Sequence, residues 1–259
     1  MTYLDSNYRL IPTPTGLEDS WLVSYERSAG RLKISIECWN AKVTDLVFHN
    51  PITMSDYGTL YTMYLGENLN ENGIEQFPYR ISHQLELNKI FSILDADDIG
   101  TLNVMSRDCE VTIRDPNPLP DQLISIHDSK ALELHHNPIN MSENIPLMNC
   151  EFISYDYRSI DQTLTINILD ELKNMISLHF FCIKWFSEFN IKSMAKSSGQ
   201  ILSSDLLHKA LSRRFLTLSQ EHDFKHFQFL NSDGQPCADI ICRAVTIGKK
   251  KNGQQDSST

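Results

Sequence analysis

The residues whose spacing comes closest to a chemical motif lie near the C-terminus of the sequence. His222 and His226 are four residues apart, and Cys237 and Cys242 follow five residues apart. Two histidines with two cysteines form a ligand set that tetrahedral zinc accepts. On a single strand, however, an odd separation places two side chains on opposite faces, so Cys237 and Cys242 would not reach the same ion. We therefore predict buried thiols and surface histidines here, and no metal.

Other histidines are candidate acid–base groups. His135 and His136 lie beside Glu133 in a proline-rich segment, where they could act as a general base or as metal ligands. A solvated pair in a loop is the interpretation we favour, because no oriented third group is visible. His49 and His179 lie at near-equivalent positions of an internal repeat, which favours a structural role for both. A hydrolase that uses the connector histidines stays an alternative.

An aspartate run also has the oxygen atoms of a cation site. Asp95, Asp97 and Asp98 precede Gly100, but the glutamate and the flanking helices of an EF-hand are missing, so an Asp-rich hairpin turn is the better interpretation. The sequence contains no phosphate-binding glycine loop, no G-x-S-x-G and no H-E-x-x-H. We predict no catalytic residue, no metal and no cofactor, which favours a binding protein over an enzyme.

An internal repeat determines which elements position these residues. Residues 23–52 resemble residues 153–183, with five apolar positions matched at a constant offset of 132. The matched positions are Leu32 with Leu164, Ile34 with Ile166, Ile36 with Ile168, Leu46 with Leu178, and Phe48 with Phe180. Apolar residues alternate with polar ones in both copies, which predicts strands with one buried face.

Both repeats are predicted to end in hairpins, at 90–113 and 226–247, because an Asp- or Gly-rich turn lies between two alternating segments. Residues 59–67 alternate like a strand. Residues 203–220 carry an apolar stripe at helical spacing, which predicts a helix. The predicted fold class is α+β, predominantly antiparallel β, with two tandem related β-rich units and at least one packed helix in the second.

The predicted organisation has four parts. Residues 1–114 form the first β-rich repeat, and 115–150 form a connector that five prolines mark and that has room for one short hairpin, QLISIHDSKALEL. Residues 151–247 form the second repeat, which includes the helix at 203–220. Residues 248–259 lack apolar side chains and are predicted to be disordered.

Charge and composition limit the partners. The 259 residues carry 23 basic and 33 acidic side chains, a net charge of −10. Residues 1–150 contribute 10 − 21 = −11 and residues 151–259 contribute 13 − 12 = +1. This balance argues against nucleic-acid binding. No apolar run approaches the ~18 residues of a membrane span, and no signal sequence is apparent, so we expect a cytoplasmic protein whose six cysteines are reduced.

The pattern as a whole resembles a known family. A tyrosine-bearing strand (VSYERS, ISYDYRS), an L-x-I-x-I strand, a strand ending in V-F or H-F, and the final segment FQFLNSDGQPCADIICRAVTI are similar to the small β-rich immunity proteins of bacterial polymorphic and contact-dependent toxin systems. The likeness covers about residues 21–113 and 152–247, here as a tandem duplication. It implies a cytosolic, non-enzymatic protein that binds and neutralises a cognate toxin domain, often a nuclease.

We expect the partner-binding surface to be acidic, to lie on the first repeat and its connector, and to bind a basic protein. A merely solvated acidic face is the alternative. The predicted contacts are Asp95, Asp97 and Asp98 at the hairpin tip, Glu67 and Glu71 on the turn after 59–67, and Trp39. Trp185 is a second candidate aromatic anchor. A structural subunit that self-associates through exposed sheet edges is a further alternative, and the oligomeric state stays open.

Overall fold

A computed structural model of the chain describes residues 8–28, 30–59, 61–62, 64–69, 88–95, 100–116, 150–189, 193–194, 196–201, 224–231 and 233–250. Every helix or strand in these ranges is a β-strand, and none of them holds a helix that is long and apolar enough to cross a membrane. The first half of the chain contains β1 (Tyr8–Leu10), β2 (Ser20–Ser28), β3 (Arg31–Glu37), β4 (Val43–His49), β5 (Thr53–Asp56), β6 (Tyr61–Thr62), β7 (Tyr64–Asn68), β8 (Lys89–Leu94), β9 (Gly100–Ser106) and β10 (Glu110–Arg114). The second half contains β11 (Cys150–Arg158), β12 (Thr163–Leu169), β13 (Met175–Phe181), β14 (Trp185–Phe189), β15 (Ser193–Met194), β16 (Lys196–Ile201), β17 (Lys225–Leu230), β18 (Pro236–Cys242) and β19 (Ala244–Lys250).

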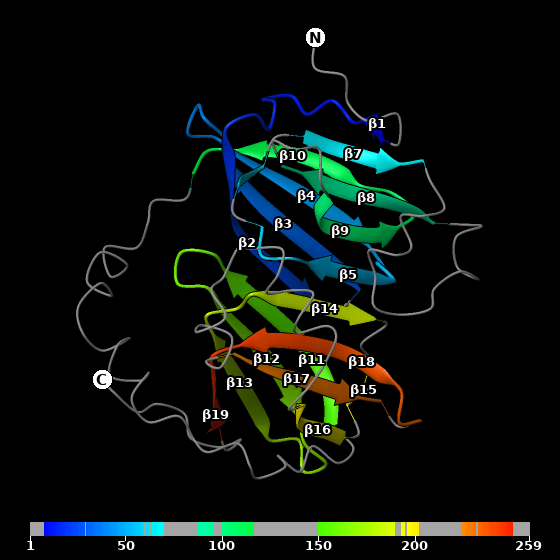
Figure 1. Ribbon diagram of the computed structural model, residues 1–259, viewed down its shortest axis with the longest axis vertical. Coiled ribbons are helices and arrows are strands. Elements are labelled where there is room, and N and C mark those ends of the chain that lie inside the picture. The colour runs from blue at the N-terminus through cyan, green and yellow to red at the C-terminus, as the bar shows by residue number, and fades with distance from the viewer. Residues whose placement is uncertain are drawn as a thin grey trace.

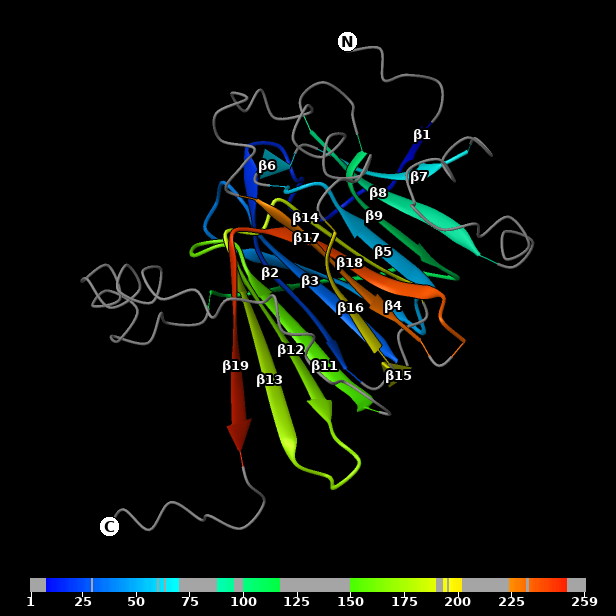
Figure 2. The same cartoon turned by 60° about the horizontal axis from the view of Figure 1, so that its bottom comes forward.

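The strands form two antiparallel sheets that pack against each other as a sandwich (Figures 1 and 2). The nine-stranded sheet has the order β1-β7-β8-β9-β5-β14-β18-β17-β16 and lies toward the viewer in Figure 1. The ten-stranded sheet has the order β10-β4-β3-β2-β11-β12-β13-β19, and β6 and β15 pair with β2 and β11. Figure 2 shows the strands of this second sheet spread side by side.

The strand order of the first half recurs in the second. In the ten-stranded sheet, β2-β3-β4-β10 corresponds to β11-β12-β13-β19, and in the nine-stranded sheet β5-β9-β8-β7 corresponds to β14-β18-β17-β16. The halves meet where β2 pairs with β11 and where β5 pairs with β14. Both sheets therefore run without a break through both halves, which lie one above the other in Figure 1.

Local geometry follows the same correspondence. A β-bulge interrupts β2 between Leu22 and Ser24, and β11 has its own between Phe152 and Ser154. The turn that follows β3 and the turn that follows β12 each contain a residue with left-handed backbone, Ala41 at φ 60° and Lys173 at φ 60°. Equivalent backbone hydrogen bonds close both turns, at 2.8 Å from Ala41 N to Cys38 O and 2.9 Å from Lys173 N to Asp170 O.

The core lies between the sheets, where the alternating residues of both repeats meet. All five matched apolar pairs of the repeat are buried there. At the junction of the halves, the rings of Tyr25 and Tyr157 stack with centroids 4.5 Å apart, and Tyr155 meets Phe186 edge to face at 4.9 Å. Large aromatic side chains from both sheets therefore fill the centre of the sandwich.

A buried ion pair joins the two sheets and the two halves. Arg27 on β2 donates to Glu188 on β14, and its second terminal nitrogen donates to the carbonyl of Pro51 at 2.8 Å. The Glu188 side chain is 0% exposed. Burial acts to lower the pKa of Arg27, but the contributions of Glu188 and Tyr155 together outweigh it, so the pKa of Arg27 is raised. The guanidinium therefore stays charged inside the core.

The prediction of an α+β class with a packed helix is wrong, because the described residues are all-β. The two sheets bury their inner faces against each other, so among the described residues strands and the turns between them form this core. Residues 203–220, where the helix was predicted, lie outside the described residues, as does most of the connector, 117–149. The predicted tail began too early, since residues 248–250 belong to β19 and pair with β13; residues 251–259 are outside the described part.

Candidate functional site

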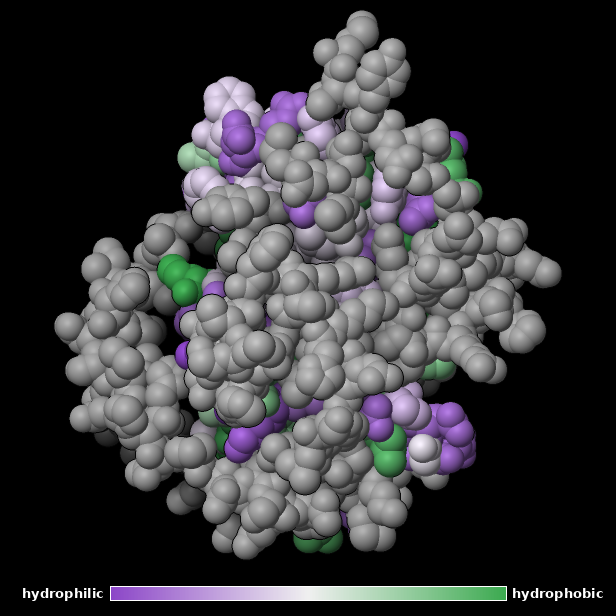
Figure 3. Space-filling model, in the orientation of Figure 1, coloured by the Kyte–Doolittle hydropathy of each residue, from purple (hydrophilic) through white to green (hydrophobic). Residues whose placement is uncertain are grey.

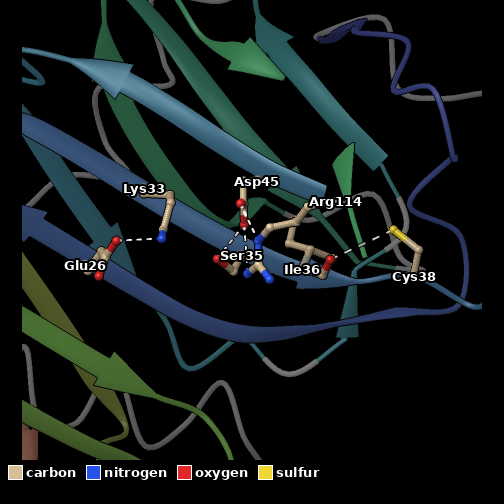
Figure 4. A network of polar contacts seen from close by, with 7 residues as sticks. All are labelled: Glu26, Lys33, Ser35, Ile36, Cys38, Asp45 and Arg114. Carbon is tan, nitrogen blue, oxygen red and sulfur yellow. Dashed lines mark hydrogen bonds and ion pairs between the residues drawn. The ribbon is translucent and has the colours of Figure 1, made fainter. Parts of the chain in front are cut away.

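The outer face of the ten-stranded sheet carries a network of polar side chains in the first half. Lys33 on β3 forms an ion pair with Glu26 on β2 at 2.6 Å. Further along, Asp45 on β4 accepts hydrogen bonds from Ser35 at 2.6 Å and from Arg114 at 2.7 Å. Figure 4 shows these groups crossing neighbouring strands on one side of the sheet. The network orders this face and leaves few of its charges unpaired.

Two carboxylates face each other where the halves join on this face. Glu26 on β2 and Asp156 on β11 are direct cross-strand partners. Burial raises the pKa of Asp156, Glu26 raises it further, and Arg158 offsets part of the rise. Like charges directly opposite each other destabilise a sheet. The junction therefore carries an unfavourable contact that Lys33 and Arg158 partly compensate.

Two exposed tryptophans lie at one end of the same sheet. Trp21 at the start of β2 is 43% exposed, and Trp39 in the turn after β3 is 67% exposed. Glu37 is the cross-strand partner of Trp21 and lies two residues before Trp39, so the two rings share this end of the sheet. We call Glu18, Asp19, Trp21, Glu37 and Trp39 the tryptophan corner.

The backbone of the tryptophan corner is held in place by contacts with the core. Leu17 is buried, and its carbonyl accepts a hydrogen bond from the N–H of Ser20 at 3.3 Å. The hydroxyl of Thr15 lies 2.9 Å from that of Thr44 and 3.3 Å from the Cys38 sulfur, which ties the segment before β2 to the turn after β3. These contacts therefore fix the backbone that carries both tryptophans.

The carboxylates of the tryptophan corner are unpaired within the described part of the chain. Glu18 and Asp19 are exposed and Glu37 is half-buried, and none of the three makes an ion pair with another described residue. In contrast, the exposed carboxylate of Glu110 lies 3.6 Å from His49 and that of Glu151 lies 3.0 Å from Lys173. The corner thus combines apolar rings with uncompensated negative charge.

The second half lacks this combination at the equivalent positions. By sheet register, Glu151 on β11 corresponds to Trp21, and Leu169 on β12 corresponds to Glu37. In the matching turns, Glu171 takes the place of Trp39. The tryptophan corner is therefore a property of the first half alone, although both halves have the same strands.

The structure does not gather the predicted contact residues on one surface. Trp39 is exposed as expected, but Glu67 lies within β7, 12% exposed, in ion pairs with Arg9 and Lys89. Asp95 follows β8 in the other sheet, and it has an interaction partner. Asp97, Asp98 and Glu71 lie outside the described residues. Trp185 is 1% exposed on β14, so it is not a surface anchor.

Trp21 was missed because of the bulge in β2. Counted back from buried Tyr25, strict alternation would place Trp21 inside and Leu22 outside. The bulge between Leu22 and Ser24 shifts the phase, so Leu22 is buried and Trp21 points out. The same kind of bulge recurs in β11, between Phe152 and Ser154.

His226 lies in a buried polar cluster, which corrects the expectation of a surface histidine. Its Nε2 is 2.7 Å from Asp239 Oδ1, and Gln228 donates to the same oxygen at 3.0 Å. Ser187, the cross-strand partner of Asp239, lies on the far side of that carboxylate. The aspartate stands between histidine and serine, whereas a nucleophilic triad needs the histidine in the middle.

The candidate zinc ligands that the structure describes do not belong to a metal site. Cys237 and Cys242 are buried, and burial raises the pKa of Cys237 to about 12. His222, like His135, His136 and Glu133, is outside the described residues. Among the residues that the structure describes, no three His, Cys, Asp or Glu side chains are grouped to hold a metal ion.

His49 and His179 do not occupy equivalent positions. In register, His49 corresponds to Phe181, and Val47 corresponds to His179. His49 is exposed at the end of β4, whereas the ring of His179 lies 3.0 Å from the Thr165 hydroxyl. Burial lowers the pKa of His179. The prediction of a structural role for both histidines rested on equivalent positions in the repeat, and the structure does not place them at equivalent positions.

The outer face of the nine-stranded sheet carries a row of buried polar side chains. Ser92 donates to Asn103 at 2.7 Å, and Ser55 and Ser187 face each other across the β5·β14 junction. All four are 0% exposed. Figure 3 shows this side of the molecule, where hydrophilic described residues reach the surface in several separate places. This row is therefore less accessible than the tryptophan corner.

Comparison of the chain with protein-family models, with curated proteins and with solved structures found no match.

Proposed function

We propose that the protein is a non-enzymatic binding protein, an immunity protein that neutralises a basic toxin domain, and that the tryptophan corner is its contact surface. The observation that carries the proposal is the pairing of two exposed tryptophans with three unpaired carboxylates on a fixed backbone. Tryptophan is enriched among the residues that dominate binding energy in protein interfaces.

Charge supports the choice of partner. The corner belongs to residues 1–150, which carry a net charge of 10 − 21 = −11. Unpaired carboxylates around an aromatic anchor attract a basic surface and speed its approach. A nuclease domain, whose substrate is polyanionic, presents such a surface. That the basic partner is a toxin is what the family resemblance of the sequence implies.

The proposal is tested by co-expression with the product of the neighbouring reading frame, which the family resemblance implies to be the cognate toxin domain. The wild-type chain should protect cells, and the double variant Trp21→Ala/Trp39→Ala should lose protection while keeping its thermal stability, because both rings are exposed. The matched control is Ile160→Ala/Leu172→Ala. These side chains are 69% and 81% exposed in turns of the second half, and their removal should leave protection unchanged.

The carboxylates are tested by association kinetics with the same domain. The variant Glu18→Gln/Asp19→Asn/Glu37→Gln should associate more slowly at low salt, and the difference from wild type should shrink as ionic strength rises above about 0.1 M. If the tryptophan variant protects cells as well as wild type does, the corner is not the contact surface.

A further inference from the structure

A polar cavity of about 480 Å³ opens at one end of the first half, away from the tryptophan corner. His49 from the end of β4, Asn50 and Ile52 from the turn before β5, Asn88 before β8, and Arg107 and Asp108 from the turn before β10 line it. This volume lies within the range of small-molecule sites. Three separate turns therefore contribute polar side chains to one cavity.

Two opposite charges line this cavity without being engaged. Arg107 and Asp108 are both exposed, and neither makes an ion pair or side-chain hydrogen bond with another described residue. Asn50 has left-handed backbone at φ 48°, and its N–H donates to the carbonyl of Gly30. The turn that carries the amide is thus fixed, while the two charged side chains are available to a ligand.

The second half contains an equivalent site, which is filled by a side chain. In the sheet register, Lys89 pairs with Ser106 as Lys225 pairs with Cys242, so Asn88 corresponds to Phe224 and Arg107 to Arg243. The turn after β4 corresponds to the turn after β13, where Cys182 matches Asn50 and also has a left-handed backbone, at φ 55°. The backbone frame of the site is therefore present twice.

In the second half an aromatic ring occupies this place. Phe224 is only 5% exposed. The guanidinium carbon of Arg243 lies 5.1 Å from the centre of its ring, and the Lys184 nitrogen lies 5.9 Å from it. Both cations are thus engaged by one ring. In the first half, Asn88 stands in place of Phe224 and His49 in place of Phe181. The first half therefore buries less apolar surface at this place, and Asn88 offers Arg107 no ring like the one that Arg243 contacts.

We propose that this cavity binds a small zwitterion, an amino acid or a short peptide, with its carboxylate on Arg107 and its ammonium group on Asp108. A simple anion would meet the carboxylate of Asp108, and a simple cation would meet the guanidinium of Arg107. A ligand with both charges satisfies both. The amide of Asn50 supplies hydrogen bonds beside the charges, and Ile52 gives the cavity an apolar wall.

Titration calorimetry of the full chain tests this with four probes. L-alanine represents a free amino acid, glycylglycine a short peptide, and sodium acetate and methylammonium chloride the single charges. One or both zwitterions should bind, with an affinity at least about tenfold above that of either single charge, because removing one of two charge contacts costs that much or more. Tighter binding of L-alanine would identify the ligand as a free amino acid, and tighter binding of glycylglycine would identify it as a short peptide.

Three variants localise the binding. Arg107→Gln and Asp108→Asn should each weaken it about tenfold or more. Asn88→Phe should abolish it by restoring the ring that fills the second half, without lowering the melting temperature. Arg243→Gln, the equivalent change in the second half, should leave affinity unchanged. Any of three results overturns the proposal. The first is that neither zwitterion binds at about 20 mM, because an affinity below that is weaker than recognised ligands show. The others are that acetate or methylammonium binds as well as the zwitterions, or that Arg107→Gln binds like wild type.

Discussion

Arg27 and Glu188 form a buried ion pair between the two halves. The pair joins β2 of the first half to β14 of the second. Glu188→Gln removes the counter-charge and leaves a buried guanidinium, which should cost about 3–5 kcal/mol of unfolding free energy. Urea unfolding measures this loss. Arg27→Met/Glu188→Met removes both charges and should recover a large part of it.

Glu151→Gln serves as the control, because it breaks an exposed pair with Lys173 and should cost less than about 1 kcal/mol. If Glu188→Gln is as stable as this control, the buried pair does not hold the halves together.

Asp156 is the second residue whose environment makes a prediction. Burial raises the pKa of this carboxyl in the folded state, so its ionisation opposes folding as pH rises through and above the unfolded value of 3.8. Asp156→Asn should therefore stabilise the protein at pH 7 by about 0.2–1 kcal/mol, the scale of a like-charge cross-strand contact. The gain should vanish below the unfolded pKa, where Asp156 is protonated in both states.

Thermal unfolding at pH 7 and at pH 3 checks this, with Asp115→Asn as the control on an exposed aspartate. A stabilisation that is the same at both pH values would show that ionisation of Asp156 is not its cause.

At the scale of elements, the two equivalent turns after β3 and β12 hold non-glycine residues in left-handed backbone. Ala41 and Lys173 both have φ 60°. Glycine adopts this conformation without the steric cost that a Cβ brings, so Ala41→Gly and Lys173→Gly should each stabilise the fold by up to about 1 kcal/mol. Because the turns lie at opposite ends of the sheet, the two gains should add.

Chemical unfolding of the single and double variants measures these gains. Ile160→Gly provides the comparison, since Ile160 lies in a turn and is not among the residues with positive φ. A destabilisation by both turn variants would show that the left-handed backbone of Ala41 and Lys173 carries no steric cost, and a gain in one turn alone would contradict the equivalence of the turns.

The alternation of apolar residues was sufficient to predict most of the strands, including the paired segments around Leu32–Ile36 and Leu164–Ile168. The hairpins predicted at 90–113 and 226–247 are confirmed in part by the pairing of β8 with β9 and of β17 with β18. The last residues of both segments belong to β10 and β19, which lie in the other sheet. The exposed face of β2 was not predictable, because a bulge reverses its phase through backbone hydrogen bonding rather than through residue type.

The site was predictable only in part, for the same reason. The exposure of Trp39 follows from its place in a turn, and the acidity of the first half follows from counting charges. The burial of Trp185 and the ion pairs of Glu67 depend on strands that are distant in sequence, β5 with β14 and β1 with β7. Periodicity within one segment carries no information about such partners.

At the scale of the whole molecule, the two halves form one body, since both sheets pass through the junction. We expect a single cooperative unfolding transition for the full chain. Residues 1–116 expressed alone would expose the edges of β2 and β5, which pair with β11 and β14 in the full chain. Unpaired edges recruit other strands. The fragment should therefore associate or aggregate, and sedimentation would contradict this account if it found a folded monomer.

The most direct test of the central claim is hydrogen–deuterium exchange of the full chain, alone and with the toxin domain that the family resemblance implies as its partner. The duplicated fold supplies its own control, because residues 37–42 and 169–174 form equivalent turns and only the first carries the tryptophan corner. The account predicts protection on binding at 18–21 and 37–42, with no change at 169–174. Protection of the second turn alone, or of neither, would contradict it.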